Sequence, residues 1–469
     1  MKTNCTIDFD DLQYQAVPLP EDIMKMKWAG NFDMVRAMIE NRLSLPNLPH
    51  AYSARLKLEL KNLCHLEACY TLTRAEVLER IQAKIPDFTD EELTQCIVEG
   101  RLEWIFLSGE MKFLSSTVSN LFRQYPDIWN RTAEGDPRVR EFDHIHKVLD
   151  GLKDGDEMKA HIHIRHDLWL EPEVIEEGKT LHVHMPLPVE RAQIHNLKVH
   201  NISPQPKHLP EDGDIMPTAY FEEPAAEGQM FTVEYEFDNI LQYVDMSKVD
   251  FEAIEQSAYP EDVLIYTREQ APHILFTPYL KALAAELKGE ETNPVKIARR
   301  IYDYITINLN YAYVRDYATL DCIPEYMALG RRGDCGVLAL LFITLCRICG
   351  IPARWQSGMY AEPGDVGNHD WAQFYVPTLG WRWADVSFGR AARLRDHEPR
   401  WNFFFGNLDP YRIPTNCDVM ADFNPPKQFI RRDPCDNQDG EAEYDDGAIC
   451  VGVRRKLTDL GIQLIKQEE

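Results

Sequence analysis

The sequence has no hydrophobic run long enough to cross a membrane and no excess of positive charge. No stretch approaches the roughly 18 apolar residues of a membrane span, and the opening MKTNCTIDFDDLQYQAVPLPED lacks the apolar core of a signal peptide. Lysine and arginine together number 50 against 76 aspartates and glutamates, which gives a net charge of −26. Such acidity argues against nucleic-acid backbones and anionic membrane surfaces as partners. We therefore expect a cytoplasmic protein that binds neither nucleic acid nor membrane.

Internal repeats and low-complexity tracts are also absent, and the cysteines do not form the pattern of a secreted disulfide framework. The chain has eleven cysteines, an odd number. Without an export signal, reduced thiols are expected. Cys346 and Cys349 form a single C-x-x-C at the end of an apolar helical run. A redox pair usually opens a helix and a zinc site needs further ligands, so we interpret this pair as buried small side chains.

The length of 469 residues and the changing hydrophobic period predict an α+β protein of four regions. Residues 1–135 have helical spacing and form an N-terminal helical domain. Residues 136–248 alternate with period two and predict a β-rich, sandwich-like domain. Residues 249–420 carry the motifs of a mixed helix and sheet domain. Residues 421–469 form a C-terminal extension, in which the acidic stretch DNQDGEAEYDDGA predicts a solvated loop.

Two capped helices and a hairpin within the first region resemble a winged-helix unit. Thr73 and Thr89 stand at N-cap positions, with Glu76 and Glu92 three residues later as capping-box partners, and the hairpin turns at Ser108-Gly109. The second helix, TDEELTQCIVEG, is acidic where a DNA-recognition helix should be basic. A protein-contact or spacer role is therefore favoured over DNA binding.

Histidines alternate in the β-rich region, in AHIHIRHDLWLEP and TLHVHMPLPVE. His161 and His163 share one face of a strand, as do His182 and His184, and such spacing is a workable zinc geometry. Nothing in the sequence brings the two pairs together. The favoured interpretation is a polar sheet face, and no metal or other cofactor is predicted.

The stretch RRGDCGVLALLFITLCRICGIPAR places one cysteine where it could react. Gly333 and Asp334 can turn the chain into a helix that Gly350 and Pro352 then end. Cys335 falls in the first turn of that helix. Unpaired backbone N–H groups there favour a thiolate and could also bind an oxyanion.

A nucleophilic cysteine needs a base and a group that orients the base, and NHDWAQFYVPTLGWRWADVSFG contains both. This stretch predicts a β-hairpin over 369–387 in which Tyr375 faces Trp381. His369 and Asp385 then lie diagonally on one face, and the opposite face is apolar. A slip of one residue would bury the carboxylate in that apolar face. The preceding AEPGDVGN predicts a loop, either a gate for the cleft or an ordinary surface turn.

With the motifs GDCGVLALLFITLCRICGIPARWQSGMY and HDWAQFYVPTLGWRWADVSFG, residues 290–390 resemble the transglutaminase-like superfamily of papain-like cysteine enzymes, bacterial type. The resemblance implies a helix that carries the cysteine, packed on an antiparallel sheet. It also implies acyl transfer with Cys335 as nucleophile, His369 as base and acid, and Asp385 as the group that orients the imidazole.

In this family a side chain upstream of the nucleophile supplies a second oxyanion donor. Tyr311, Tyr313 and Tyr326 lie in that region, and the sequence does not decide among them. Trp371, beside His369, is expected to wall the cleft.

The resemblance favours a cysteine-dependent amide or peptide hydrolase that works through a thioester on the enzyme. Its substrate would be a peptide or another amide. Two alternatives stay open: transfer of the acyl group from a protein glutamine to an amine, and a scaffold that binds peptides without catalysis. Calcium-dependent cross-linking would need ligand clusters that the sequence does not contain. The oligomeric state is left open.

Overall fold

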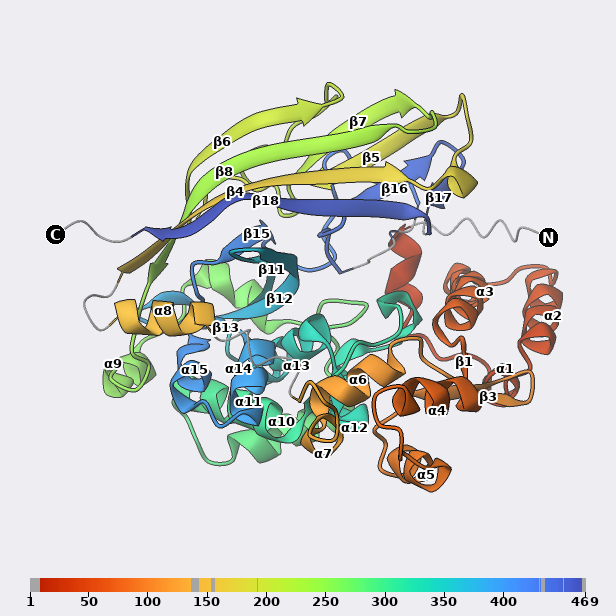
Figure 1. Ribbon diagram of the computed structural model, residues 1–469, viewed down its shortest axis with the longest axis horizontal. Helices are drawn as coiled ribbons and strands as arrows, with labels where there is room; N and C mark the ends of the chain where they lie inside the picture. The colour runs from red at the N-terminus through yellow and green to blue at the C-terminus, as the bar shows by residue number, and fades with distance from the viewer. Residues whose placement is uncertain are drawn as a thin grey trace. The chain divides into compact units, whose positions relative to one another are not determined.

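The computed structural model describes residues 9–135, 143–152, 157–191, 193–429, 431, 435–449 and 451–465, and the chain divides into two compact units (Figure 1). Unit 1 combines Met1–Phe142, Ala271–His273 and Asn310–Asp334. Unit 2 combines Asp143–Gln270, Ile274–Leu309 and Cys335–Glu469. The domain boundary predicted at residue 136 lies outside the described residues. No helix in the described ranges is both long enough and apolar enough to cross a membrane.

Unit 1 is mainly helical, as the spacing of its apolar residues predicts. Its elements are η1 (Phe9–Tyr14), α1 (Glu21–Trp28), α2 (Phe32–Leu43), α3 (His50–Cys69), β1 (Leu72–Thr73), α4 (Arg74–Gln82), α5 (Asp90–Val98), β2 (Trp104–Leu107), β3 (Glu110–Phe113), α6 (Thr117–Gln124), α7 (Pro126–Trp129), β9 (Asn310–Tyr311), η5 (Tyr317–Thr319), α12 (Ile323–Gly330) and β10 (Arg332–Gly333). Both predicted capping boxes are confirmed, at the starts of α4 and α5. The predicted hairpin is confirmed as β2 and β3, which with β1 form a three-stranded sheet.

The segment just before Cys335 folds into unit 1, far in sequence from the helices around it. Tyr326 donates a hydrogen bond from its hydroxyl to the buried carboxylate of Glu103, at 2.7 Å, and Arg315 forms an ion pair with the same carboxylate, also at 2.7 Å. Asn120 and the backbone of Tyr313 exchange two hydrogen bonds of 2.8 Å. A buried carboxylate needs such partners to offset its lost hydration. These contacts fix residues 310–334 among the N-terminal helices.

Unit 2 contains two four-stranded sheets, drawn in the upper part of Figure 1, which confirm the period-two prediction. One has the order β18-β4-β8-β6 and the other β17-β16-β5-β7. Their strands are β4 (Glu157–Leu170), β5 (Thr180–Pro186), β6 (Ile194–Ser203), β7 (Thr218–Pro224), β8 (Met230–Gln242), β16 (Glu441–Tyr444), β17 (Gly447–Ile449) and β18 (Val453–Ile465). The rings of Phe221 and Phe231 meet between the two sheets, with centroids 5.3 Å apart. The two predicted histidine pairs lie in different sheets, one on β4 and one on β5.

The C-terminal residues build both of these sheets, because β16 pairs with β5 and β18 pairs with β4. The prediction of a solvated loop over DNQDGEAEYDDGA is therefore wrong for most of that stretch. Glu441 and Glu443 are buried in β16, where the ammonium group of Lys427 lies 3.3 and 3.6 Å from their carboxylates. The sequence shows the acidic residues but not the distant lysine that permits their burial.

The rest of unit 2 is a five-stranded sheet with helices packed on it (Figure 1). The strand order is β14-β13-β12-β11-β15. The strands are β11 (Ala353–Glu362), β12 (Asp365–Val376), β13 (Gly380–Ala384), β14 (Phe405–Gly406) and β15 (Arg412–Asn416), and the helices and turns are α8 (Asp143–Gly151), η3 (Pro172–Val174), α9 (Phe251–Gln256), η4 (Glu261–Thr267), α10 (Pro278–Lys288), α11 (Pro294–Asn308), α13 (Cys335–Ile348), α14 (Val386–Leu394) and α15 (Glu398–Phe403). Helix α13 is buried from Gly336 to Arg347 and contacts α10, α11, α14, β11 and β12. It forms the centre of this part of unit 2.

The predicted hairpin is confirmed in register but not in length. Tyr375 pairs with Trp381, as predicted, in β12 and β13. The second strand ends at Ala384 because the carboxylate of Asp385 accepts a hydrogen bond from the backbone N–H of Phe388 and thereby caps α14. The predicted loop AEPGDVGN is also wrong: most of it lies in β11 and β12, which pair up to Glu362 and Asp365. The polar ends of these two strands have the composition of a loop, and this is why a loop was predicted.

Candidate active site

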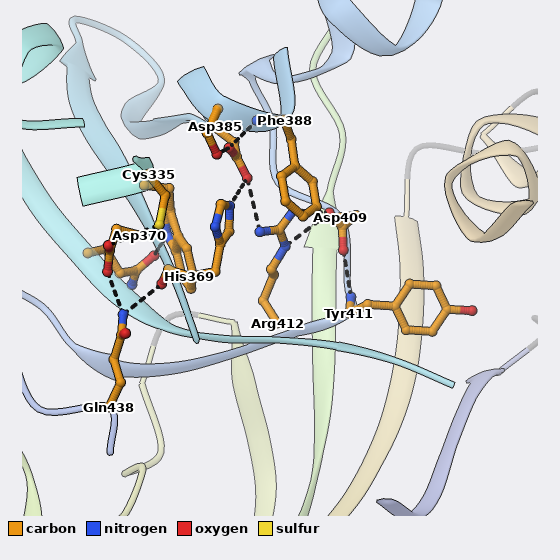
Figure 2. Close-up of polar contacts among 12 residues, drawn as sticks. Cys335, His369, Asp370, Asp385, Phe388, Asp409, Tyr411, Arg412 and Gln438 are labelled. Atoms are coloured by element: carbon orange, nitrogen blue, oxygen red, sulfur yellow. Dashed lines mark hydrogen bonds and ion pairs between the residues drawn. The ribbon is translucent and has the colours of Figure 1, made fainter. Parts of the chain in front are cut away.

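Cys335 is the first residue of α13, as predicted, and its side chain is half-buried. The thiol donates a hydrogen bond to Oδ2 of Asp370, with Sγ 3.2 Å from the oxygen (Figure 2). Asp370 lies on the face of β12 that α13 covers, two residues before Ala372 and four before Phe374. The rings of Phe374 and Phe342 of α13 are 5.9 Å apart and hold the helix on this face. The position of the sulfur therefore follows from the packing of α13 on β12.

His369 and Asp385, which the hairpin register places diagonally, do form a hydrogen bond. Nε2 of His369 lies 2.7 Å from Oδ2 of Asp385, and the two side chains are 4% and 0% exposed. In the view of Figure 2 the imidazole lies between the Cys335 side chain and the Asp385 carboxylate. Because Nε2 faces the carboxylate, Nδ1 is the ring atom left to exchange a proton with another group.

Asp385 is held by three further groups besides the imidazole. The backbone N–H of Phe388 donates to Oδ1 at 2.9 Å, and the hydroxyl of Ser387 lies 3.3 Å from the same oxygen. Arg412, on β15, places Nη1 2.9 Å from Oδ2 and is itself completely buried. Nε of Arg412 also donates to Asp409 at 3.0 Å. The carboxylate is thus compensated on both oxygens, which a buried charge requires.

The ionisation of this pair follows from burial and from its partners. Burial lowers the pKa of His369, and the Asp385 carboxylate opposes that shift only in part. Burial alone would raise the pKa of Asp385, but His369 and Arg412 lower it to about 2. At neutral pH the imidazole is therefore neutral and the carboxylate ionised. A neutral imidazole with a fixed tautomer is able to act as a base.

Besides Arg412, the sequence left Asp370 and Gln438 unidentified beside this pair. Gln438, from the C-terminal segment, donates a hydrogen bond from Nε2 to Oδ1 of Asp370 and another to the backbone carbonyl of His369, at 3.1 Å (Figure 2). The next residue, Asp439, accepts from the side-chain amide of Asn368 at 2.6 Å. The sequence did contain a signal for Asp370, since alternation along the strand places it on the same face as the apolar residues 372, 374 and 376. For Gln438 there was none, because it is nearly 70 residues away in sequence.

The remaining predicted site residues lie in two places. Trp371 is fully buried next to His369, and its indole N–H donates to Oε1 of Gln356 at 2.7 Å. Tyr313 and Tyr326 belong to unit 1, where Tyr326 is bonded to Glu103. The expectation that one of these tyrosines is the second oxyanion donor stays a prediction.

In the described residues, one group of three side chains has metal-ligand spacing, and it is not at this site. It consists of His163, His200 and Glu236, in the sheet β18-β4-β8-β6. At Cys335 the residues present are instead a thiol, a buried imidazole and a buried carboxylate. Such a set can perform covalent chemistry on an acyl group without a bound cofactor.

Comparisons with known proteins identify a family whose model matches part of this chain. A family model described as the Transglutaminase-like superfamily matches residues 281–386. An "Uncharacterized protein" of Haemophilus influenzae is 27% identical over 186 residues, which are 32% of this chain and 49% of the relative. The "Uncharacterized protein YebA" of Bacillus subtilis is 27% identical over 121 residues, 22% of this chain and 16% of the relative. The chain thus matches about half or less of the length of these two relatives.

Two similar solved structures have low TM-scores. One is titled "The Crystal Structure of a Putative Cysteine Protease from Cytophaga hutchinsonii", with a TM-score of 0.42, 16% identity and coverage of 66% of this chain and 92% of that one. The periplasmic domain of TgpA from Pseudomonas aeruginosa has a TM-score of 0.27, 15% identity and coverage of 51% and 91%. The predicted resemblance itself is confirmed by the family model, which matches residues 281–386 and so includes Cys335, His369 and Asp385.

Proposed function

We propose that this protein is a cysteine-dependent hydrolase of peptide or other amide bonds. In it, Cys335 is the nucleophile, His369 the base and acid, and Asp385 the residue that orients the imidazole. The observation that carries the proposal is the buried hydrogen bond of 2.7 Å from His369 to Asp385. The residue after His369 is Asp370, whose carboxylate contacts the Cys335 sulfur. A buried imidazole fixed in this way has one nitrogen left for proton transfer, and Cys335 at the N-terminus of α13 supplies the thiol.

The first half of the reaction forms a thioester. The thiol loses its proton to Nδ1 of His369, and the sulfur attacks the amide carbonyl to give a tetrahedral oxyanion. Backbone N–H groups of the first turn of α13 are available to bind that oxyanion. The C–N bond then breaks as His369 returns the proton to the departing amine. Asp385, ionised throughout, stabilises the positive charge that His369 carries between these steps.

The second half releases the acyl group. Water attacks the thioester as Nδ1 of His369 takes a proton from it, and the sulfur leaves as the thiolate and regains the proton. Arg412 keeps the Asp385 carboxylate ionised in both halves. No step needs a metal or a redox cofactor.

The test is a comparison of two variants on a defined mixture of peptides. Cys335→Ala should abolish amide cleavage while the circular dichroism spectrum stays unchanged, because a half-buried thiol contributes little packing. Cys64→Ala is the matched control, since this thiol is exposed and lies in unit 1, and it should keep full activity. Equal cleavage by the wild-type protein and Cys335→Ala would refute the proposal.

A second measurement uses the thiols directly. In the wild-type protein, iodoacetamide at neutral pH should modify Cys335 at least tenfold faster than the exposed Cys64, since the thiolate is the reactive form. Mass spectrometry of peptides after short exposures measures both rates in one sample. Equal rates at the two positions would contradict an activated nucleophile.

Transfer of the acyl group to an amine is the second candidate, and Asp370 favours it. Its carboxylate lies 3.2 Å from the sulfur, so a protonated amine could be held beside the thioester before it loses a proton and attacks. Adding a primary amine should then divert product from the acid to the amide. Asp370→Asn should raise the KM for the amine and leave the hydrolysis rate less affected. No amide product at high amine concentration would leave hydrolysis as the reaction.

A further inference from the structure

A second cluster of chemically active side chains lies on the outer face of the sheet β18-β4-β8-β6, apart from the cysteine site. His163 is on β4, Glu236 on β8 and His200 on β6, so the carboxylate lies on the strand between the two histidines. One possible ligand atom from each of the three lies within 4.8 Å of the others. All three side chains are partly exposed.

Strand pairing explains why the three side chains converge. His163 is directly opposite Glu236 in the antiparallel pair β4 and β8, so both point to the same face. On the other side, β6 changes register between Val199 and Asn201, which leaves His200 as an extra residue in the strand. A bulge of this kind re-aims a side chain. Here Nε2 of His200 comes to 3.0 Å from Oε2 of Glu236.

The neighbouring groups suit a metal rather than only a set of ion pairs. His163 has Nε2 3.1 Å from Oε1 of Glu234, which leaves its Nδ1 as the possible ligand. A histidine that ligates a metal usually donates its other ring N–H to a carboxylate in this way. Lys198 contacts Oε1 of Glu236 at 2.9 Å, and His200 contacts Oε2. A metal on Oε2 would therefore not displace the lysine.

We propose that His163, His200 and Glu236 bind a first-row divalent metal ion, with Zn²⁺ as the reference ion. Two imidazoles and one carboxylate are a common ligand set for zinc and leave one coordination position for water. A polar sheet face was the favoured interpretation because nothing in the sequence brings the histidine pairs of different strands together. The third ligand comes from a bulge that the sequence does not show.

The test is zinc titration of the full-length protein after treatment with a chelator. Isothermal titration calorimetry should show one site in the wild-type protein that His200→Ala and Glu236→Gln each weaken at least tenfold. His195→Ala is the matched control: it removes an exposed histidine from the same strand, outside the cluster, and should bind zinc as the wild type does. A zinc affinity equal in the wild type, His200→Ala and Glu236→Gln would overturn the proposal.

Cobalt binding distinguishes this site from zinc held by cysteines. Co²⁺ in a site of two histidines and a carboxylate lacks the intense thiolate-to-metal absorption band that cysteine ligands produce. The wild-type protein should therefore bind one Co²⁺ without that band, and added Zn²⁺ should raise its melting temperature. Appearance of the thiolate band at one equivalent, or a melting temperature unaffected by Zn²⁺, would assign the metal elsewhere and refute the proposal.

Discussion

Replacing Asp370 with asparagine should make Cys335 react faster with an electrophile near neutral pH. In the structure the thiol donates to Oδ2 of Asp370, and Gln438 donates to Oδ1 of the same carboxylate. A hydrogen bond from Gln438 favours the ionised carboxylate. The negative charge of the Asp370 carboxylate then opposes a negative charge on the Cys335 sulfur. Asparagine has the same shape and no charge, and its amide N–H could donate to the thiolate.

The size of the effect follows from the distance of 3.2 Å between Sγ and Oδ2. Coulomb's law gives about 1 kcal/mol of repulsion between two unit charges at this distance in water, and about 5 kcal/mol at the effective dielectric constant of a site near a protein surface. Each 1.36 kcal/mol moves a titration by about one pH unit. Because Cys335 is only half-buried, we expect a repulsion energy near the lower of these two values. The midpoint of alkylation against pH should fall by about one to two units.

The assay is the rate of iodoacetamide modification of Cys335, measured by mass spectrometry over a range of pH. Asp365→Asn is the control: it removes the same charge from the same strand, at an exposed position. Solvent and salt screen a charge there, so this variant should change the rate less than twofold. At pH values well below the wild-type midpoint, Asp370→Asn should react roughly tenfold faster than either the wild type or the control.

A slower reaction in Asp370→Asn would refute the reasoning. It would mean that the carboxylate accepts the proton of the thiol and so promotes thiolate formation. In that case Asp370 would share the role of base with His369, and the proposed mechanism would need revision at its first step. An unchanged midpoint would equally contradict the electrostatic argument, since a charge this close must act if it is ionised.

Three further predictions concern the support of the site and the acid stability of unit 2. Asp385→Asn should lower kcat at least 100-fold and also the free energy of unfolding by about 3 kcal/mol, because Arg412 loses a buried partner; urea unfolding and peptide cleavage measure both, and an active variant would argue against the assigned role. Gly358→Ala should cost about 3 kcal/mol or prevent folding, since a Cβ there would lie 1.9 Å from the carbonyl oxygen of Ile413 at a φ of 155°; an unchanged melting temperature would contradict the close approach. Burial lowers the pKa of His166 from 6.5 to about 4 in the folded state. The unfolded state therefore binds a proton more readily, and stability that is fully present above pH 6.5 is lost as the pH falls toward 4. His166→Phe should therefore lose about 2 kcal/mol less stability than the wild type between pH 7 and pH 5, and parallel stability curves against pH would refute this.

Local signals in the sequence were sufficient to predict the elements that carry the reacting groups. The start of α13 at Cys335 and the pairing of Tyr375 with Trp381 both depend on residues close in sequence. Helix caps and strand alternation act over a few residues, and they need no knowledge of the rest of the chain. The hydrogen bond between His369 and Asp385 follows directly from that pairing.

The parts that sequence could not supply depend on contacts between distant segments. Arg412 lies on β15 and Gln438 in the C-terminal segment, and neither position has a local pattern that indicates a site residue. The burial of Glu441 and Glu443 depends on Lys427 in the same way. A charged residue predicts exposure unless its partner is known. The end of β13 is different, since Asp385 at a helix N-cap was a readable signal that the strand interpretation overlooked.

The distribution of charge explains how the site could keep a reactive thiol in check. The buried cation of the site, Arg412, lies at the Asp385 carboxylate, whereas the sulfur faces the carboxylate of Asp370. Arg412 therefore stabilises the carboxylate to which we assign the orientation of the imidazole. In the free protein the thiol donates a hydrogen bond to Asp370, whose charge opposes part of the thiolate stabilisation that the helix N-terminus supplies. A substrate whose positive or hydrogen-donating group engages Asp370 would remove that opposition, so binding and activation of the nucleophile would be coupled through one side chain.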